Sequence, residues 1–421
     1  MRGNFRELQE CRLCGGTFYL ETVKLKDSPL ANELYPTKES ALLADTFALE
    51  VVMCTKCKHI QLKHIVDPER LFSEYIYASG TSTTFKNHFS NLAKRIVKLV
   101  PEGMALEVGS NDGTLLEALR EQGLKTIGVE PSEYLANMSR TKSDFIYHDF
   151  LDAKLCRQIH DKHGFIDVVV GNNVFAHIDD LMGAFRHVLE LLKNNGYFIF
   201  EVAHVLSLVQ NHLFDTIYHE HMSYHSIISL ESLLNEIGFD LIEVEEIETH
   251  GGSIRIICQK SKTRTARSSG IEEILVKEKA AGLGSQIWMK DFNSYLQVLR
   301  HKTEAAISSF PTDTVWFGYG APAKAVTFIN EFDLGSLKII GIVDDNSEKQ
   351  GKFLPVSSIS VVSKSELMQE MAPLSTKNEY ACIIFPWNLS EEILGKLPNI
   401  DYGRYRAVWF LPTFKERRLD K

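Results

Sequence analysis

The chain has 421 residues, and its 44% hydrophobic and 24% charged content is typical of a globular protein too long for one core. Its formal net charge of −9 disfavours a nucleic-acid partner, because binding to phosphates needs a surplus of Lys and Arg. From the length we expect two or three domains. We find no signal peptide and no apolar run that could span a bilayer, so we expect a cytoplasmic protein without a membrane partner.

Two Cys-x2-Cys pairs mark the first part of the chain, Cys11 with Cys14 and Cys54 with Cys57. Each pair has the spacing that lets two thiolates reach one metal ion, and four thiolates complete a tetrahedral Zn²⁺ site. In a cytosolic protein zinc is favoured over disulfides. A closed four-sulfur site leaves no position for a substrate, so we expect a structural zinc ion in a small module.

The stretch after this module contains Tyr75 and Tyr77 among polar residues and a glycine. Two tyrosines in such a stretch can line a site, and they can equally pack inside a linker. Apolar residues at helical spacing then predict an amphipathic helix over residues 85–99, which leads into the first strand of the next domain.

A strand, a glycine turn and a helix follow in direct succession. The apolar residues 105–108 run into Gly109, Asn111, Asp112 and Gly113, and a helical pattern begins at once. The glycines let a ligand approach the backbone, and the helix start offers N–H groups that lack intrahelical partners. This order of elements predicts the first unit of a doubly wound nucleotide-binding sheet.

The glycine turn favours S-adenosylmethionine over NAD as the ligand. It departs from Gly-x-Gly-x-x-Gly, and Asn111 and the negatively charged Asp112 would fill the space where a pyrophosphate needs close backbone approach. The same side chains suit a ligand that carries an amino acid and a sulfonium cation. The next predicted strand, 126–129, ends at Glu130, whose carboxylate can accept hydrogen bonds from two ribose hydroxyls.

Four predicted strands alternate with helices in the central part of the chain: 105–109, 126–129, 166–170 and 197–202. This alternation predicts a parallel sheet covered on both faces, which binds ligands beyond the carboxyl ends of its strands. Asn172, Asn173 and Glu201 lie at such ends. Asp149 falls where a third strand should end, and it can meet an adenine amino group or cap a helix.

The most unusual stretch is 214–226, where three histidines, two tyrosines and a glutamate fall within eight positions: Tyr218, His219, Glu220, His221, Tyr224 and His225. A catalytic acid–base cluster, a metal site with histidines at i and i+4, and a purely structural cluster remain open as interpretations. The nearby His177 is expected to be a packing or capping histidine.

The last part of the chain repeats the nucleotide-binding pattern. Residues 230–258 predict a helix and two strands that close the central sheet with an antiparallel edge, 260–275 predict a loop, and 285–308 predict a long helix. A further strand, glycine turn and helix then contain Gly320 and Lys324, where the lysine and the helix N-terminus can meet phosphate. Both a ligand-binding and a structural role stay open for this unit.

Taken in order, these motifs resemble one family. The double Cys-x2-Cys module, Glu-Val-Gly-Ser-Asn-Asp-Gly, Asn-Asn-Val-Phe-Ala-His-Ile, Tyr-His-Glu-His-x-x-Tyr and Gly-Tyr-Gly-Ala-x-Ala-Lys follow one another along nearly the whole chain. This order resembles the dTDP-sugar C-3 methyltransferases, which use S-adenosylmethionine to methylate nucleotide-linked 4-keto-6-deoxyhexoses in branched deoxysugar pathways.

The resemblance implies an α/β fold of three domains. These are a zinc-binding module (1–72), a central Rossmann-like S-adenosylmethionine methyltransferase domain (73–262), and a C-terminal Rossmann-like domain with a leading helix (263–421) that helps to hold the nucleotide sugar. We expect a monomer that acts on a small-molecule nucleotide sugar, with S-adenosylmethionine and structural Zn²⁺ as cofactors.

By motif, the resemblance places the catalytic base on His221, with Tyr218 and Glu220 beside it as supporting or orienting groups. It places Asn173 near the sugar and brings in one tyrosine from the first module. The predicted site residues are His221, Tyr218, Glu220, Tyr75, Tyr77 and Asn173 for catalysis, Gly109, Asn111, Asp112, Gly113, Glu130, Asp149 and Asn172 for the cofactor, and Tyr224, His225, Gly320 and Lys324 for the substrate.

The chemistry of the residues agrees with this interpretation. The carbon next to a sugar ketone carries an acidic proton, which a histidine can remove at neutral pH if donors stabilise the enolate. That carbon then attacks the sulfonium methyl in line, without a metal. The alternatives are an O- or N-methyltransferase on another metabolite, a non-catalytic nucleotide-sugar- or partner-binding protein, and a dehydrogenase, which the glycine pattern disfavours.

Overall fold

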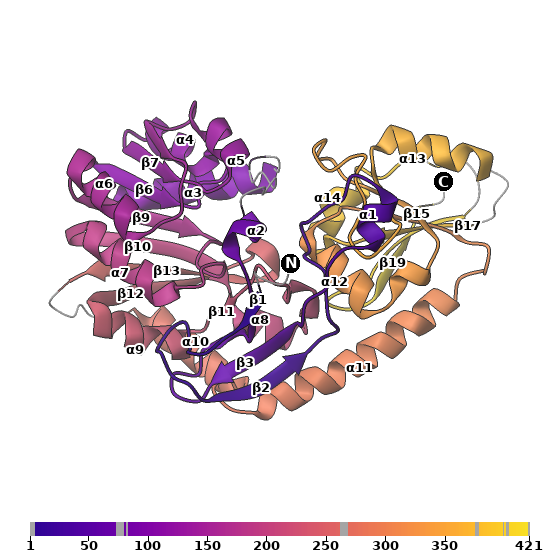
Figure 1. Ribbon diagram of the computed structural model, residues 1–421, viewed down its shortest axis with the longest axis horizontal. Coiled ribbons are helices and arrows are strands. Elements are labelled where there is room, and N and C mark those ends of the chain that lie inside the picture. The colour runs from indigo at the N-terminus through magenta and orange to yellow at the C-terminus, as the bar shows by residue number, and fades with distance from the viewer. Residues whose placement is uncertain are drawn as a thin grey trace.

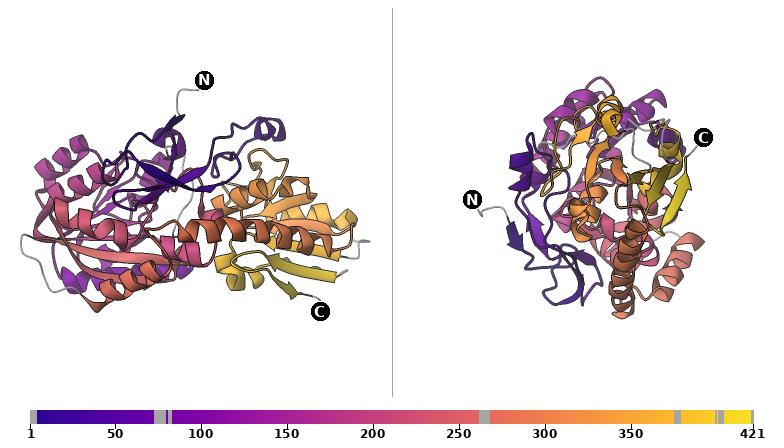
Figure 2. Two further views of the ribbon diagram at one scale, coloured as in Figure 1. Left: turned by 90° about the horizontal axis from the view of Figure 1, so that it is seen from below. Right: turned by 90° about the vertical axis from the view of Figure 1, so that its right-hand side faces the viewer.

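The computed structural model describes residues 5–72, 80, 83–261, 268–374, 379–398, 400 and 404–419. Two sheets covered by helices form the two ends of the molecule, and the N-terminal segment, including its strands and α1, lies along one side of both (Figures 1 and 2). The long helix α11 (Ile287–Ser308) runs along the bottom edge in Figure 1 and joins the two ends. Among the described residues, no helix combines the length and the apolarity needed to cross a membrane.

The N-terminal module is built from short antiparallel strands. Its four-stranded sheet has the order β11-β4-β3-β2, and β1 pairs with β5 beside it. Strand β11 (Ser223–Tyr224) comes from far along the chain and lies within the histidine-rich stretch 214–226. The other elements are β1 (Phe5–Glu7), β2 (Tyr19–Lys24), α1 (Lys38–Leu42), β3 (Glu50–Cys54), β4 (Ile60–Leu62), β5 (His64–Val66) and α2 (Pro68–Phe72).

The central sheet has seven strands in the order β12-β13-β10-β9-β6-β7-β8. The run from β10 to β8 is parallel, and β13 and β12 close it antiparallel, as the sequence predicted. The strands are β6 (Met104–Val108), β7 (Lys125–Val129), β8 (Phe145–Tyr147), β9 (Ile166–Asn172), β10 (Leu192–Ala203), β12 (Phe239–Ile247) and β13 (Ser253–Lys260).

Helices cover both faces of this sheet, because its inner strands are apolar on both sides. Val168, Val169 and Val170 of β9 are each fully buried, although consecutive side chains of a strand point to opposite faces. The covering helices are α3 (Thr83–Leu99), α4 (Thr114–Glu121), α5 (Glu133–Ser139), α6 (Ala153–His163), α7 (Leu181–Leu191) and α9 (Ile227–Ile237), with α8 (Val205–Gln210) after β10.

The polar stretch 260–275, predicted as a loop, contains the start of a helix. Helix α10 (Ser269–Ala280) forms because Ile271, Ile274 and Leu275 pack against the core of the central sheet. Three apolar residues at helical spacing among many charged ones were too weak a pattern to predict it.

The C-terminal sheet has six strands in the order β16-β15-β14-β17-β18-β19, all parallel except β19 at the edge. It confirms the second Rossmann-like unit that the sequence predicted. Its elements are β14 (Val315–Tyr319), α12 (Ala323–Glu331), β15 (Ile339–Val343), β16 (Val361–Val362), α13 (Lys364–Met371), β17 (Glu379–Ile384), α14 (Ser390–Leu394), β18 (Arg404–Trp409) and β19 (Lys415–Arg418).

Candidate functional site

The loop between β6 and α4 is shaped by three residues in left-handed backbone conformations. Gly109, Asn111 and Gly113 have φ values of +64°, +51° and +78°. A Cβ atom at Gly109 would lie 2.9 Å from Val174 Cγ2, so the loop needs glycine there for space as well as for φ. The loop thus exposes its backbone at the carboxyl end of the central sheet, where doubly wound sheets bind ligands.

Glu130 holds this loop in place. Its Oε2 accepts a hydrogen bond from Asn111 N at 2.8 Å, and its Oε1 accepts one from Ser132 N at 2.9 Å. Burial raises the pKa of this carboxyl group, and the two backbone donors oppose the shift. Each carboxylate oxygen can accept a second hydrogen bond, so the predicted ribose contact remains compatible with this geometry.

A cleft of about 500 Å³ opens over this loop and extends to the C-terminal domain. It brings together residues that lie far apart in the sequence. Among the predicted site residues, it is lined by Gly109, Asn111, Asp112, Glu130, Asp149, Asn172, Asn173, Tyr218, His221 and Lys324.

The acids of the predicted cofactor site have distinct partners. Asp112 accepts a hydrogen bond from Thr114 Oγ1 at 2.7 Å and forms an ion pair with Lys142 at 3.3 Å, which offsets its charge. Asp149 Oδ1 accepts from Phe150 N at 2.9 Å, while Asp152 is the N-cap of α6. Asp149 therefore does not cap that helix, and its place in the cleft leaves the adenine contact as its expected role.

Glu107 lines the same cleft and was missed from the sequence. It lies within β6, is 3% exposed, and accepts a hydrogen bond from Asn172 Nδ2 at 3.4 Å. Burial raises its pKa well above the ordinary value. An acid inside an otherwise apolar strand, directly before a glycine turn, was a signal that could have identified it.

Tyr218 and His221 form a hydrogen-bonded pair in the cleft wall. Tyr218 Oη lies 2.7 Å from His221 Nε2, and His221 Nδ1 lies 2.7 Å from the carbonyl oxygen of Thr216. A carbonyl can only accept, so Nδ1 carries the hydrogen and Nε2 of the neutral ring is the basic nitrogen. The pair therefore offers a base, with a phenol hydrogen-bonded to it.

His177 and Glu220 surround this pair but face different directions. The His177 ring centroid lies 5.0 Å from that of His221, and His177 lines the cleft. Its Nδ1 donates to the backbone oxygen of Glu220 at 2.7 Å, and burial lowers its pKa to about 4. The side chain of Glu220 instead accepts two hydrogen bonds from Asn32 Nδ2, at 2.8 and 2.7 Å, and does not line the cleft.

Three predicted substrate residues lie outside the cleft. Tyr224 and His225 are 5% and 0% exposed, because β11 pairs with β4 and His225 Nε2 bonds the Phe175 oxygen at 3.1 Å. Gly320 has a φ of +78°, and a Cβ there would lie 2.3 Å from Pro386 Cγ. These residues shape the surrounding chain, and His225 does not join His221 in a metal site.

The prediction of a catalytic tyrosine at position 75 or 77 falls outside the described residues. Lys324, in contrast, is placed as predicted at the first turn of α12, and it lines the cleft from the C-terminal domain. Its Nζ lies 4.4 Å from the centroid of the Trp387 ring. Burial lowers the pKa of Lys324, and the nearby Asp215 carboxyl group opposes the shift.

The four cysteines of the N-terminal module converge. Cys11 Sγ lies 3.7 Å from Cys57 Sγ, and Cys14 Sγ lies 3.6 Å from Cys54 Sγ. A tetrahedron of thiolates about 2.3 Å from a zinc ion has edges of roughly 3.8 Å, so this donor set fits Zn²⁺. Within the described residues, it is the one group of three or more His, Cys, Asp or Glu side chains with such spacing, and none of the four lines the cleft.

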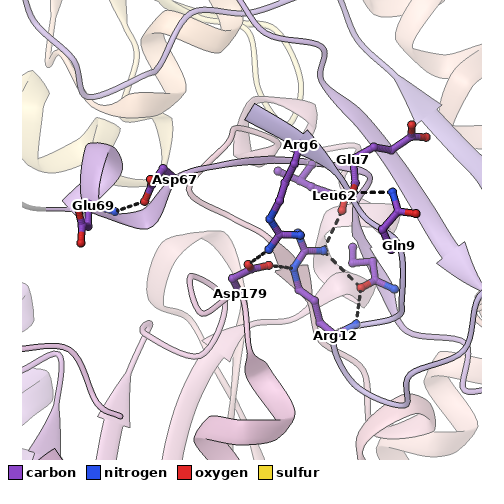
Figure 3. Close-up of polar contacts among 9 residues, drawn as sticks. Arg6, Glu7, Gln9, Arg12, Leu62, Asp67, Glu69 and Asp179 are labelled. Atoms are coloured by element: carbon purple, nitrogen blue, oxygen red, sulfur yellow. Dashed lines mark hydrogen bonds and ion pairs between the residues drawn. The ribbon is translucent and has the colours of Figure 1, made fainter. Parts of the chain in front are cut away.

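An ion pair connects this module to the loop that carries His177 (Figure 3). Arg12 lies between the first two cysteines and is 6% exposed. Its guanidinium group donates to the Leu62 oxygen at 2.8 Å and to Asp179 Oδ1 at 3.3 Å, and Arg6 also pairs with Asp179. The module therefore contacts the cleft wall through ion pairs to Asp179, of which the Arg12 side is buried.

The strand order, the glycine loop after β6 and the acid after β7 define a Rossmann-like methyltransferase that uses S-adenosylmethionine. Family models match in sequence: a zinc binding domain at residues 11–72, a methyltransferase domain at 85–244, and a C-methyltransferase C-terminal domain at 248–412.

A curated relative covers nearly the whole chain. C-methyltransferase NovU of Streptomyces niveus is 30% identical over 399 residues, which are 94% of this chain and 93% of that protein. The chain therefore belongs to this family of S-adenosylmethionine-dependent C-methyltransferases with an N-terminal zinc-binding domain. The resemblance drawn from its motifs is confirmed.

Two solved methyltransferase structures are similar to part of the chain. Magnesium protoporphyrin IX methyltransferase (ChlM) from Synechocystis PCC 6803 with bound SAH has 17% identity and a TM-score of 0.34, over 42% of this chain and 83% of that one. The CcbJ methyltransferase from Streptomyces caelestis has 14% identity and a TM-score of 0.33, over 41% and 89%.

Proposed function

We propose that this enzyme transfers a methyl group from S-adenosylmethionine to C3 of a nucleotide-linked 4-keto-6-deoxy sugar, with dTDP as the expected carrier. The observation that supports this most is the Tyr218–His221 pair in the wall of the cleft that also contains the β6–α4 loop. Carbon methylation needs a base at the acceptor carbon, because a C–H group is not itself a nucleophile. The name of the relative NovU, a C-methyltransferase, supports a carbon acceptor.

His221 is the proposed base. Its Nδ1–H is held by the Thr216 carbonyl, so Nε2 receives the proton that leaves C3. Tyr218 Oη lies 2.7 Å from that nitrogen. The C3 proton can therefore pass to the phenol oxygen while the phenol gives its own proton to Nε2. The electron pair of the broken C–H bond forms an enolate with the neighbouring ketone. After this relay the Tyr218 hydroxyl carries the proton taken from C3, and both this hydroxyl and the amide of Asn173 are donors in the cleft that can stabilise the enolate oxygen.

The bound S-adenosylmethionine supplies an electrophilic methyl group for C3, and S-adenosylhomocysteine and a C–CH3 group result. The β6–α4 loop, Glu130 and Asp149 would hold it, with Glu130 on the ribose and Asp149 on the adenine amino group. Asn172 and Glu107 would lie near its amino acid end. By fixing both reactants in one cleft, these residues supply much of the rate acceleration.

Lys324 is the proposed contact for the diphosphate of the nucleotide sugar. It faces the cleft from the first turn of α12, where N–H groups without intrahelical partners add positive potential. The C-terminal domain would thus hold the nucleotide while the central domain holds the methyl donor. We expect a cytoplasmic enzyme, because a four-thiolate site needs reduced cysteines. We also expect a monomer, which sedimentation analysis can test.

Mass spectrometry in deuterated water tests this proposal. A dTDP-4-keto-6-deoxyhexose incubated with enzyme and S-adenosylmethionine should gain one methyl group and lose the C3 proton. Without the methyl donor, the same sugar should exchange C3–H for deuterium, and His221→Ala should abolish both reactions. Methylation of an oxygen or nitrogen without exchange would contradict the proposal and favour an O- or N-methyltransferase.

A further inference from the structure

The segment that carries Tyr218 and His221 is held at both ends by parts of the chain outside the central sheet. After the pair, β11 joins the N-terminal sheet next to β4. Before it, the short helix η2 (Phe214–Thr216) packs on α12 of the C-terminal domain. Phe214 is fully buried there, with its ring centroid 5.7 Å from that of Phe328 and 4.9 Å from that of Phe332. The geometry of the pair therefore depends on neighbouring domains.

Asp215 extends this contact with a polar one. Trp387 Nε1 donates a hydrogen bond to Asp215 Oδ2 at 2.7 Å, and Asp215 is 1% exposed. Its other oxygen, Oδ1, is buried and has no hydrogen-bond partner within the described part of the chain. The charge of Lys324 favours the ionised carboxylate, although burial raises the pKa of Asp215 to about 6. A buried acid with one hydrogen bond depends strongly on that bond for its position.

The Trp387 ring is itself held between the two domains. On one side, a Cβ atom at Gly251, the last residue of the short helix η3 (Thr249–Gly251) before β13, would lie 2.4 Å from Trp387 Cη2, so the ring packs directly on this glycine. The Nζ of Lys324 lies 4.4 Å from the ring centroid, a distance typical of a cation–π contact. Trp387 thus touches the acid, the glycine and the lysine at once.

We propose that Asp215 and Trp387 form an interdomain latch that positions the Tyr218–His221 pair, which makes them positioning residues for the proposed reaction. Thr216 follows Asp215 directly, and its carbonyl accepts the hydrogen bond from His221 Nδ1 at 2.7 Å. Displacing Asp215 moves this carbonyl, and with it the ring orientation and tautomer of His221. This inference rests on the proposed function, since it assigns the latch to the same proton transfer.

The latch also connects the base to the nucleotide contact. Lys324, the residue proposed to bind the diphosphate, lines the cleft and contacts the Trp387 ring. The same indole donates the hydrogen bond to Asp215. Loss of the indole N–H should therefore affect kcat through His221, and loss of the whole ring should in addition raise KM for the nucleotide sugar through Lys324. Binding of S-adenosylmethionine should stay unchanged, because its contacts lie on the central sheet.

Conservative variants separate the hydrogen bond from the packing. Trp387→Phe removes the donor and keeps an aromatic ring, Asp215→Ala removes the acceptor, and Asp215→Asn keeps an acceptor oxygen. Trp288→Phe is the matched control, because Trp288 is 2% exposed and its Nε1 has no hydrogen-bond partner among the described residues. Each variant is checked by thermal unfolding, S-adenosylmethionine affinity, kcat, KM, and ¹⁵N NMR of labelled histidines to follow the His221 tautomer.

We expect Trp387→Phe and Asp215→Ala to lower kcat at least about tenfold, since a misplacement of about 1 Å can cost 100-fold. Both should change the His221 ¹⁵N signals and leave the affinity for S-adenosylmethionine within about twofold. Asp215→Asn and the control Trp288→Phe should keep the wild-type signals and kcat within about threefold.

Two outcomes would overturn the latch. One is a loss of thermal stability in Trp387→Phe or Asp215→Ala with unchanged His221 signals and kcat. The other is an Asp215→Asn variant as impaired as Asp215→Ala. If Trp387→Phe does not fold, the comparison of the two Asp215 variants decides alone. If the wild-type enzyme methylates no nucleotide sugar, the proposed function fails, while the NMR comparison still decides whether the latch positions His221.

Discussion

The two ring nitrogens of His221 have different partners, and this difference would set the direction of the proposed proton transfer. The Thr216 carbonyl fixes the hydrogen on Nδ1, and Tyr218 lies on Nε2. The hydrogen bond made by one ring nitrogen selects the tautomer of a histidine and orients the ring for the other nitrogen. Neighbouring positions in the same motif have other contacts. Glu220 accepts a hydrogen bond from Asn32, and Tyr224 does not line the cleft.

A pair of tyrosine variants tests this division at the residue scale. Tyr218→Phe removes the hydroxyl on His221 and should lower kcat at least about tenfold, because general acid–base groups contribute 10²–10⁴-fold. Tyr224→Phe is the matched control: its hydroxyl is buried, has no hydrogen-bond partner in the described residues, and lies outside the cleft. Steady-state kinetics of both variants would contradict the assignment if Tyr224→Phe were the more impaired one.

Glu220 should make stability depend on pH. Burial raises its pKa from 4.5 to about 7 in the folded protein, although Asn32 and the charge of Lys349 oppose the shift. Between these two values the unfolded chain loses this proton and the folded protein keeps it, so the free energy of unfolding falls as pH rises and levels off above pH 7.

Glu220→Gln should remove this part of the pH dependence. Urea unfolding at pH 5 and pH 8 should differ less for the variant than for the wild type, by on the order of 1–3 kcal/mol. The exposed Glu121→Gln variant is the control and should keep the wild-type dependence. An unchanged pH dependence in Glu220→Gln would mean that the carboxyl group is ionised in the folded protein.

At the scale of elements, the loop between β9 and α7 forms the wall between the N-terminal module and the cleft. Asn173, His177 and Asp179 of this loop line the cleft, and Asp179 also accepts a hydrogen bond from Arg12 of the module. Asp179 is the partner of the buried Arg12 guanidinium group. Removing the partner of a buried charge costs more than the bond itself contributes, because the charge stays buried.

Asp179→Asn should therefore lower the free energy of unfolding by about 1–3 kcal/mol and raise KM for the nucleotide sugar through the displaced loop. Thermal unfolding and steady-state kinetics measure the two effects. Asp161→Asn is the control, because Asp161 lies on the surface of α6 and pairs there only with His160 among the described residues. Equal stability of both variants would show that Arg12 does not depend on Asp179.

Most regular elements were predictable from local patterns, whereas contacts between distant segments were not. Apolar runs and glycine turns identified β6, β7, β9, β10 and β14, because a buried parallel strand is apolar on both sides. Strand β11 has two residues and exists only because β4 lies next to it. The same reason explains why the position of Glu220 against Asn32 and the bond from Trp387 to Asp215 could not be predicted: their partners lie in other domains.

At the scale of the whole molecule, three parts of the chain meet at the segment that carries Tyr218 and His221. The central sheet supplies the cofactor loop, the C-terminal domain holds η2, and the N-terminal module pairs with β11. The motifs predicted three units in this order, and the domain boundaries at residues 72 and 262 stay predictions. The cleft is built by the whole chain, so its chemistry should depend on the integrity of each part.

Loss of zinc tests this dependence. A module of this size has a small core, and four thiolates without their metal leave it unstable. Chelation, or Cys14→Ser, should lower the thermal midpoint and reduce methyl transfer, although no cysteine lines the cleft. Metal analysis should find one zinc ion per chain, and Cys156→Ser, outside the cluster, should retain it. Full activity of a zinc-free protein would contradict a role of the module in supporting the cleft.

The measurement that tests the central claim most directly is the position of the new methyl group. With S-adenosylmethionine labelled by ¹³C in its methyl group and a dTDP-4-keto-6-deoxyhexose as acceptor, long-range carbon–proton NMR of the product identifies the atom that received the methyl. We predict that the methyl protons correlate with C3 and with the neighbouring C4 carbonyl carbon. A methyl signal typical of an O–CH3 group, or one attached to a carbon not adjacent to the ketone, would contradict base-assisted methylation at C3.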